Sequence, residues 1–562
     1  MSSHDHCCCG LWHLRRDMSL NKQTPAEPPS AAQPRLTSLG TAAQTLCASL
    51  VGTHMIVPHA TPKEPVQINE LDLAMMHFPG VTAHNFYHST LDTRRVKDAF
   101  ARVLTNNPVL AGRLRSKRRD ASGQPVEVEV HFDGVVGVPF HAKEMDPLLE
   151  FELQGFRSDR SVAGHPMEWE QMVEKLGIRN AGTGASQIDA EQDRPLCAVT
   201  YVAGKSTSAL TLSVSHLLGD GSTYFQLLKA WDQEVAAPGS TQPMLGRHAV
   251  LEVDREFKSR CTQWEQDALK AFYPERYKDG YLSRNLLEYH MVSTSLSDSV
   301  LKAIKAEQQE MIGDGVIFST QDSLIAWLGG TLRAKWFAFT VDLRGRSEAL
   351  PVNTLGNAFQ TWYGVPEAGP LKFSALDVRR AIDARGADIR PALEHALSTG
   401  LEDSIDVNSW LKLQYLPTFG ADAWKQVRAL GRGSMPFLFR MNYHVMYQIE
   451  RGENIMFSFG LLREQAERLA ERWRSLGATS TVTSGTELLD ALGDDHGALQ
   501  AELGDPCDEL FHDLPHGLTL EDVQQFRESY FGWRRGDDSG VMRKRNAPKM
   551  RGTTKSRGTT FF

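Results

Sequence analysis

One short stretch near the middle of the chain holds residues whose types and spacing could do acid–base chemistry. It reads His216-Leu-Leu-Gly-Asp220-Gly221. A neutral imidazole, with an ordinary pKa of about 6.5, can accept a proton at working pH, so His216 is a candidate general base. A histidine on an apolar strand face is also commonly a packed, hydrogen-bonded residue, and the six residues alone leave both interpretations open.

The flanking residues predict the elements that would position His216. From Ala209 to His216 apolar and polar residues alternate, which predicts a strand with His216 at the end of its buried face. Apolar residues then recur at helical spacing up to Val235, which predicts a helix that Ser222 could cap. At a strand end, His216 would lie where a cleft between domains can reach it, and Gly221 lets the backbone turn sharply after it.

The same spacing favours an architectural role for Asp220. The turn after His216 points the two side chains in different directions, so Asp220 would pair with a distant cation, either Arg344 or Arg346. Losing that pair would leave a buried charge alone, at a cost of about 3–5 kcal/mol.

No sequence motif supplies a separate nucleophile. The chain contains no Gly-X-Ser-X-Gly, His-Glu-X-X-His or Cys-X-X-Cys pattern, and we predict no metal site. A base without a protein nucleophile suits direct transfer. A substrate hydroxyl or amine would lose its proton to His216 and attack an activated acyl group brought by a carrier.

Length and composition indicate two domains with flanking segments. The chain has 562 residues, of which 41% are hydrophobic and 23% charged, with a net charge of -8. This length exceeds one core, and the acidic balance gives no electrostatic case for binding nucleic acid. Strands and helices mix in both halves, so we predict an α/β class with mixed sheets. The predicted parts are a disordered segment (1–48), an N-terminal domain with the His216 stretch (49–240), a crossover linker (241–285), a C-terminal domain (286–485) and a mostly disordered extension with a basic tail (486–562).

The termini leave several interpretations open. The Cys7–Cys9 cluster could bind metal or carry acyl chains, and the basic tail could touch an acidic surface or simply be solvated. The first 48 residues fit a plastid leader or a plain disordered tail. No run of eighteen apolar residues exists, so no transmembrane segment is expected. The scattered cysteines favour a reducing compartment, and we expect a cytoplasmic monomer.

With these residues in hand, the sequence resembles the BAHD acyltransferases. His216-Leu-Leu-Gly-Asp220-Gly221 is similar to their HxxxDG motif, which the wider group with chloramphenicol acetyltransferase and peptide-synthetase condensation domains shares. Condensation domains usually carry a second histidine just before the catalytic one, and Ser215 there favours the BAHD side. Further landmarks follow in the family's order over roughly residues 50–480: Leu71-Asp72, Val96–Phe100, Leu110–Leu114, Ser319–Trp327, Val341–Arg346 and Leu355-Gly-Asn357.

The resemblance implies a fold and a reaction. The fold would be two chloramphenicol acetyltransferase-like domains with an active-site channel between them. Acyl-CoA, as co-substrate, and a small-molecule alcohol or amine would both reach His216 there, and no cofactor would be bound permanently. The implied activity is an acyl-CoA-dependent O- or N-acyltransferase of secondary metabolism, for acyl groups other than amino-acyl, with Gly221, Arg344 and Arg346 supporting the site.

Two stretches depart from the family pattern. Asn408-Ser-Trp410 matches the family's Thr-Ser-Trp except at its first position. In relatives this stretch lines the acceptor side, so Asn408 could donate a hydrogen bond to the oxyanion, worth about 2.7–4 kcal/mol, or could merely end a strand. The Asp-Phe-Gly-Trp-Gly signature appears only as Thr418–Asp422, which puts packing of the C-terminal domain or carrier docking in doubt.

Two other functions therefore stay open. One is a condensation-type transferase that takes its acyl group from a carrier protein. The other is a decayed, non-catalytic relative that binds a ligand.

Overall fold

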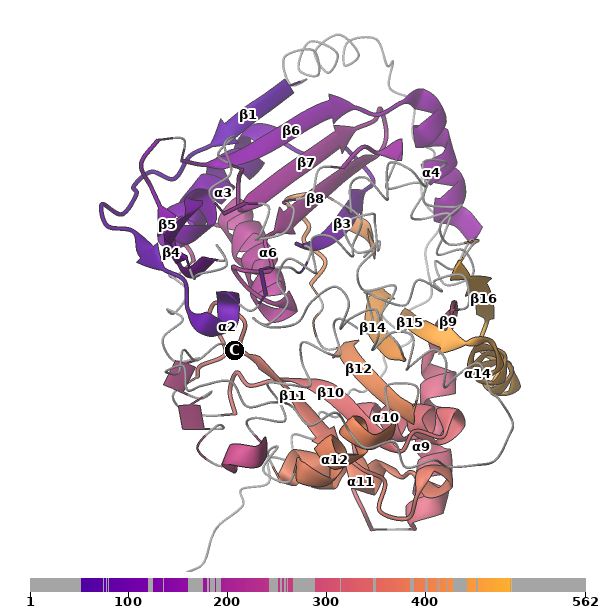
Figure 1. Ribbon diagram of the computed structural model, residues 1–562. Coiled ribbons are helices and arrows are strands. Elements are labelled where there is room, and N and C mark those ends of the chain that lie inside the picture. The colour runs from indigo at the N-terminus through magenta and orange to yellow at the C-terminus, as the bar shows by residue number, and fades with distance from the viewer. Residues whose placement is uncertain are drawn as a thin grey trace, which may run out of the picture. The chain divides into compact units, whose positions relative to one another are not determined.

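The structure is a computed structural model that describes residues 52–487 with gaps, the longest at 160–174, 242–250, 266–288 and 428–441. The predicted segment 1–48 and nearly all of 486–562 lie outside the described residues, as does most of the predicted linker 241–285. The described strands form three sheets, and helices pack against them (Figure 1).

The first half of the described chain holds two of these sheets. Its elements are β1 (Gly52–Ile56), β2 (Val66–Gln67), α2 (Glu70–Leu73), β3 (Val81–Tyr87), α3 (Thr93–Asn106), η1 (Pro108–Ala111), β4 (Arg113–Arg119), β5 (Pro125–His131), β6 (Val138–Glu144), α4 (Pro147–Asp159), β7 (Cys197–Ala203), β8 (Ser208–Val214) and α6 (Gly221–Ala236).

A six-stranded sheet forms the centre of this half, in the order β1-β6-β7-β8-β3-β13, and its last strand, β13 (Ala423–Val427), comes from the second half of the chain. Strands β6 and β7 are parallel, and the other pairs are antiparallel. Strands β2, β5 and β4 form a separate small antiparallel sheet.

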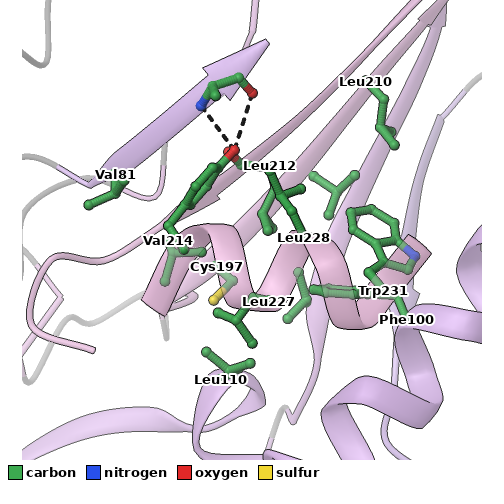
Figure 2. Packing of buried hydrophobic residues seen from close by; sticks show 14 of the residues in the cluster. Val81, Phe100, Leu110, Cys197, Leu210, Leu212, Val214, Leu227, Leu228 and Trp231 are labelled. Atoms are coloured by element: carbon green, nitrogen blue, oxygen red, sulfur yellow. Dashed lines mark hydrogen bonds between the residues drawn. The ribbon is translucent and has the colours of Figure 1, made fainter. Parts of the chain in front are cut away.

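Helix α6 packs its apolar face on strand β8. Figure 2 shows Leu212 and Val214 of β8 beside Leu227 and Leu228 of α6. The same helix contacts α3 through Trp231 and Phe100, whose ring centroids are 4.3 Å apart. This packing fixes the end of β8 and the start of α6, and therefore the turn between them.

The predicted strand before His216 is present, but it is shorter and more buried than expected. It ends at Val214, so His216 lies two residues beyond it, in the turn. The polar face is also covered, because Thr211 bonds to His84 (2.9 Å) and Ser213 bonds to Thr82 (2.8 Å) on β3. Polar residues here satisfy one another across the strands instead of facing water.

The second half holds a seven-stranded sheet, in the order β11-β10-β12-β14-β15-β9-β16. Its elements are β9 (Tyr289–Ser297), α9 (Asp298–Ile312), α10 (Thr320–Leu332), β10 (Trp336–Asp342), β11 (Phe359–Gly364), η4 (Pro370–Lys372), α11 (Ala375–Asp383), α12 (Arg390–Thr399), β12 (Ser404–Trp410), β13 (Ala423–Val427), β14 (Tyr443–Glu450), β15 (Glu453–Leu462), α14 (Arg463–Ser475) and β16 (Ser480–Ser484).

Both faces of the seven-stranded sheet are buried. Met456 and its neighbours on one face pack with residues of α9, α10 and α14. Ile455, Phe457 and Phe459, on the other face of β15, belong to the same core cluster as β8 and α6. Strands β10–β12 and β12–β14 are parallel, while β14, β15, β9 and β16 run antiparallel. The predicted α/β class with mixed sheets is confirmed, whereas the domain boundaries stay predictions.

Residues 410–427 connect the two large sheets. The chain leaves β12 at Trp410 and joins the six-stranded sheet as β13, which pairs with β3. Between these strands it contacts α6 repeatedly, so we call the described part of 410–427 the α6 strap. Asp232 of α6 accepts hydrogen bonds from the Thr418 and Phe419 amides (3.1 and 2.6 Å).

The strap contains Thr418–Ala421 of the altered signature, whereas Asp422 lies outside the described residues. Its Phe419 ring packs on Trp231 with 4.6 Å between centroids, and Phe419 and Gly420 both have positive φ (47° and 78°). The consecutive backbone N–H groups of Thr418 and Phe419 both point at the Asp232 carboxylate. Thr418 and Phe419 are thus held through backbone atoms, which the replaced side chains of the signature do not remove.

Candidate functional site

His216 lies in a tight turn that ends in a capped helix. The Leu218 amide donates to the Ser215 carbonyl (2.9 Å), and the Asp220 carboxylate accepts from the Thr223 amide (2.9 Å) as the N-cap of α6. The prediction that Ser222 caps the helix is wrong, because Ser222 already lies inside the first turn. Its hydroxyl instead donates to the Asp342 carboxylate.

Asp220 pairs with Arg344, one of its two predicted partners. Two guanidinium nitrogens donate to the two carboxylate oxygens at 2.9 and 3.1 Å. Only 2% of the Arg344 side chain and 10% of the Asp220 side chain are exposed. Asp220 Oδ2, which accepts the 2.9 Å bond from Arg344, also accepts from the Ala358 amide (3.0 Å). Because this pair is bidentate and almost fully shielded from solvent, it holds the His216 turn against the second half of the chain.

Arg344 is held by several groups besides Asp220. It donates to Asp342 (3.1 Å), to the Thr223 hydroxyl (3.0 Å) and to the carbonyls of Thr354 and Gly356 (2.8 and 2.7 Å). Burial alone would lower the pKa of Arg344, but the charge and hydrogen bonds of Asp220, and then those of Asp342, outweigh burial and raise it. The guanidinium is therefore a fixed cation of the site.

Arg346 does not join this cluster. It is exposed, its Nε donates to the backbone carbonyl of Asp342 (2.9 Å), and its guanidinium lies over the Trp362 ring at 5.8 Å. Of the two arginines predicted as partners of Asp220, the structure brings only Arg344 to the His216 turn.

The His216 imidazole is oriented by Asn357. Its Nδ1 lies 3.1 Å from the Asn357 side-chain oxygen, and the Asn357 amide nitrogen donates to the backbone carbonyl of His216 (2.9 Å). The Phe78 ring lies beside the imidazole, with centroids 5.6 Å apart. Asn357 in turn donates to the buried carboxylate of Asp72. The two hydrogen bonds to Asn357 and the contact with Phe78 fix the position and the plane of the His216 ring.

Gly221 permits a close approach between the start of α6 and the strap. A Cβ atom at this position would come within 2.9 Å of the Trp410 indole. Trp410 is buried and also meets Phe225 edge-on at 6.3 Å. Trp410, predicted for the acceptor side, therefore contacts the residue that follows Asp220.

Asn408 holds Trp410 from strand β12. Its side-chain oxygen accepts from the Trp410 indole N–H (2.8 Å), and its side-chain nitrogen donates to the Tyr443 hydroxyl (2.9 Å). Both interpretations of Asn408 from the sequence stay open: it lies within a strand, and it also has a second amide hydrogen available by its chemistry.

Several residues of this cluster have no role in the sequence-based prediction. Asp72 and Asn357 stand in quoted landmarks, but neither landmark indicates that it reaches His216. Asp342 also stands in such a landmark, Val341–Arg346, with no indication of its contacts, whereas Thr223 and Tyr443 carry no signal in the sequence. Their common feature is that each depends on a contact between segments more than thirty residues apart.

Within the described ranges no group of three or more His, Cys, Asp or Glu residues is arranged to hold a metal ion. Nor does any helix there have the length and apolar content needed to cross a membrane.

Comparison with known proteins gives a fold and no sequence family. No family model matches the chain, and no curated protein matches it either. Among solved structures, vinorine synthase is similar with a TM-score of 0.50 at 15% identity, over 76% of this chain and 98% of that one. The TRI101 protein of F. sporotrichioides, in complex with coenzyme A and T-2, gives a TM-score of 0.51 at 14% identity, over 74% and 100%. That of F. graminearum, in complex with coenzyme A and deoxynivalenol, gives 0.51 at 13%, over 74% and 99%. The chain therefore has the chloramphenicol acetyltransferase-like fold of these acyltransferase structures.

Proposed function

We propose that this protein is an acyltransferase that moves an acyl group from acyl-CoA to a hydroxyl or amine of a small molecule, with His216 as general base. The observation that carries the proposal is the geometry around His216. Its imidazole is held through Nδ1 by Asn357 (3.1 Å), in a turn that the buried Asp220–Arg344 pair fixes. The fold supports it, because structures with this fold were determined with coenzyme A.

The reaction balances with these residues alone. The acceptor loses the proton of its O–H or N–H to the imidazole, and its oxygen or nitrogen attacks the thioester carbonyl. The tetrahedral intermediate collapses with cleavage of the C–S bond, and the imidazolium returns the proton to the departing thiolate. Ester or amide and free coenzyme A are the products. Asp220 and Arg344 take no proton in this scheme and act by holding the turn.

Further details of the site belong to the same proposal. Asn408 and Trp410 would line the acceptor side, with Gly221 allowing Trp410 to approach, and acyl-CoA would enter a channel between an N-terminal (49–240) and a C-terminal (286–485) domain. We also propose that the protein acts as a monomer in the cytoplasm. Arg346 is left out of this set because it lies away from the Asp220 cluster.

A thiol-release assay tests the proposal. The protein is incubated with a panel of acyl-CoAs and alcohol or amine acceptors, and free thiol and acylated product are measured. We expect His216→Ala to abolish transfer and to lower the free energy of unfolding by only about 1 kcal/mol, the net value of one hydrogen bond. His59→Ala, which changes an exposed histidine of a loop, is the matched control and should keep full activity.

The outcome also separates the alternatives. Full activity of His216→Ala would refute the base. Transfer only from an acyl group on a carrier protein would favour the condensation-type enzyme, and no transfer with any donor, together with binding of one, would favour a non-catalytic relative.

A further inference from the structure

Asp72 is a fully buried carboxylate that reaches the His216 site from the first half of the chain. It lies in α2, is 0% exposed, and is 285 positions away from Asn357 in sequence. Its Oδ1 accepts from the backbone N–H (2.9 Å) and from the side-chain nitrogen (2.8 Å) of Asn357. Its Oδ2 accepts from the Asn69 side-chain nitrogen (2.8 Å). Burial of a charge is tolerated where such donors surround it.

These contacts decide which way the Asn357 amide faces. Its nitrogen has two hydrogens, one directed at the Asp72 carboxylate (2.8 Å) and one at the His216 carbonyl (2.9 Å). Neither of those oxygens can donate. If the amide were reversed, its oxygen would face both of them, with three acceptors and no hydrogen between them. The Asn357 oxygen therefore faces Nδ1 of His216.

The orientation of the amide in turn fixes the tautomer of His216. An amide oxygen only accepts hydrogen bonds, so the 3.1 Å contact with Nδ1 requires that Nδ1 carry the hydrogen. A neutral imidazole has one N–H, which leaves the lone pair on Nε2. The nitrogen that can take a proton is thus Nε2, on the side of the ring away from Asn357.

We propose that Asp72 is a positioning residue: by fixing the Asn357 amide, it keeps His216 in the tautomer whose Nε2 accepts the proton. This inference rests on the proposed function for its catalytic meaning, but the tautomer itself is a property of the protein alone. A wrong tautomer would direct the hydrogen, instead of the lone pair, at the acceptor.

Nitrogen NMR of the full chain, labelled with 15N at histidine, measures the tautomer without any substrate. Spectra are recorded about two pH units above the ordinary imidazole pKa of about 6.5, and the His216 signals are assigned as those that His216→Ala removes. We expect the protonated nitrogen of His216 to be Nδ1. A dominant Nε2–H form in the unchanged protein would overturn the proposal.

The variant Asp72→Asn tests the role of the carboxylate with little change in shape. In it, one side-chain oxygen becomes an NH2 group, which faces a donor either at Asn69 or at Asn357. We expect a mixture of the two His216 tautomers and a fall in kcat of about 10–100-fold, the size of loss seen when partners that orient metal-binding histidines are removed, with KM for acyl-CoA unchanged. Asn357→Ala is a second variant with the same expected mixture, should Asp72→Asn fail to fold.

Asp232→Asn is the matched control. Asp232 is also a buried carboxylate that accepts several hydrogen bonds, but none of its bonds involves His216 or Asn357. We expect the single His216 tautomer to persist in this variant even if its stability falls. An unchanged tautomer ratio and unchanged kcat in Asp72→Asn would refute the role of Asp72, whereas the failure of His216→Ala to affect transfer would refute the proposed function and leave the tautomer result standing.

Discussion

Removal of Asp220 should destabilise the protein mainly by leaving Arg344 without its bidentate partner. Only 2% of the Arg344 side chain is exposed, and breaking a pair buried this deeply costs about 3–5 kcal/mol. Asp342, whose side chain is 40% exposed, still contacts Arg344 and offsets part of that cost. The lost N-cap of α6 adds about 1 kcal/mol. We expect Asp220→Ala to lower the free energy of unfolding by about 4–5 kcal/mol.

Asp220→Asn should cost less, because asparagine caps a helix as well as aspartate does. It keeps an oxygen for the Thr223 amide and loses the charge toward Arg344, so we expect about 2–3 kcal/mol, in line with a hydrogen bond to a charged group. Both variants should also lose transfer activity, since the turn that carries His216 loses its anchor.

A double-mutant cycle isolates the pair itself. Asp220→Ala, Arg344→Met and the double variant are unfolded in urea and followed by tryptophan fluorescence and far-ultraviolet circular dichroism. The double variant no longer buries an unpaired charge, so its loss should fall short of the summed single losses by about 2–3 kcal/mol. The exposed pair Arg115–Asp133, with side chains 42% and 64% exposed, is the control, and its coupling should stay below about 1 kcal/mol. A coupling for Asp220–Arg344 below about 0.5 kcal/mol would refute the anchoring role.

Two further predictions concern residues around α6. If the Asn408 amide stabilises the oxyanion, Asn408→Ala lowers kcat about 10²–10³-fold in the thiol-release assay with KM for acyl-CoA unchanged, whereas an unchanged kcat with lower stability would restrict Asn408 to holding Trp410. For Glu234, burial alone would raise the pKa, but hydrogen bonds, first from Thr241 and then from Arg102, outweigh burial and lower the pKa to about 2. A carboxyl group with a depressed pKa contributes stability that is complete above about pH 4.5 and is lost as pH falls toward 2. The free energy of urea unfolding of Glu234→Gln should therefore depend less steeply on pH between 5 and 3 than that of the unchanged protein. An equal pH dependence in the two proteins would contradict this explanation.

The sequence predicted the elements around His216 because local patterns determine them. Alternation predicted β8, and apolar residues at helical spacing predicted α6, whose last residue is Ala236. The pairing of Asp220 with a distant arginine also followed from chemistry, since a carboxylate directed away from the base needs a cation. The choice between Arg344 and Arg346 did not follow, because it depends on which guanidinium the end of β10 turns inward.

Other parts of the site had no local signal. Asn357 orients His216 through the two hydrogens of its amide, and Asp72 orients Asn357, but these contacts join segments 141 and 285 positions apart. Strand β12 was predicted only as one of two alternatives, a strand that Asn408 would end, and for a different reason. Its Asp406 and Asn408 are residue types that are depleted in strands, although Ile405 and Val407 alternate with them on the buried opposite face.

Because of the α6 strap, the chain cannot be cut into two halves without taking a strand from the six-stranded sheet. Strand β13 supplies the last strand of the six-stranded sheet, although it lies nearly two hundred residues after α6 in sequence. A fragment that stops within 241–285 would leave the outer edge of β3 with unpaired N–H and C=O groups, which is a template for aggregation. The missing strand would have to be donated in trans by the complementary fragment. The two halves of this protein are therefore expected to be mutually dependent for solubility, as the partners in strand complementation are.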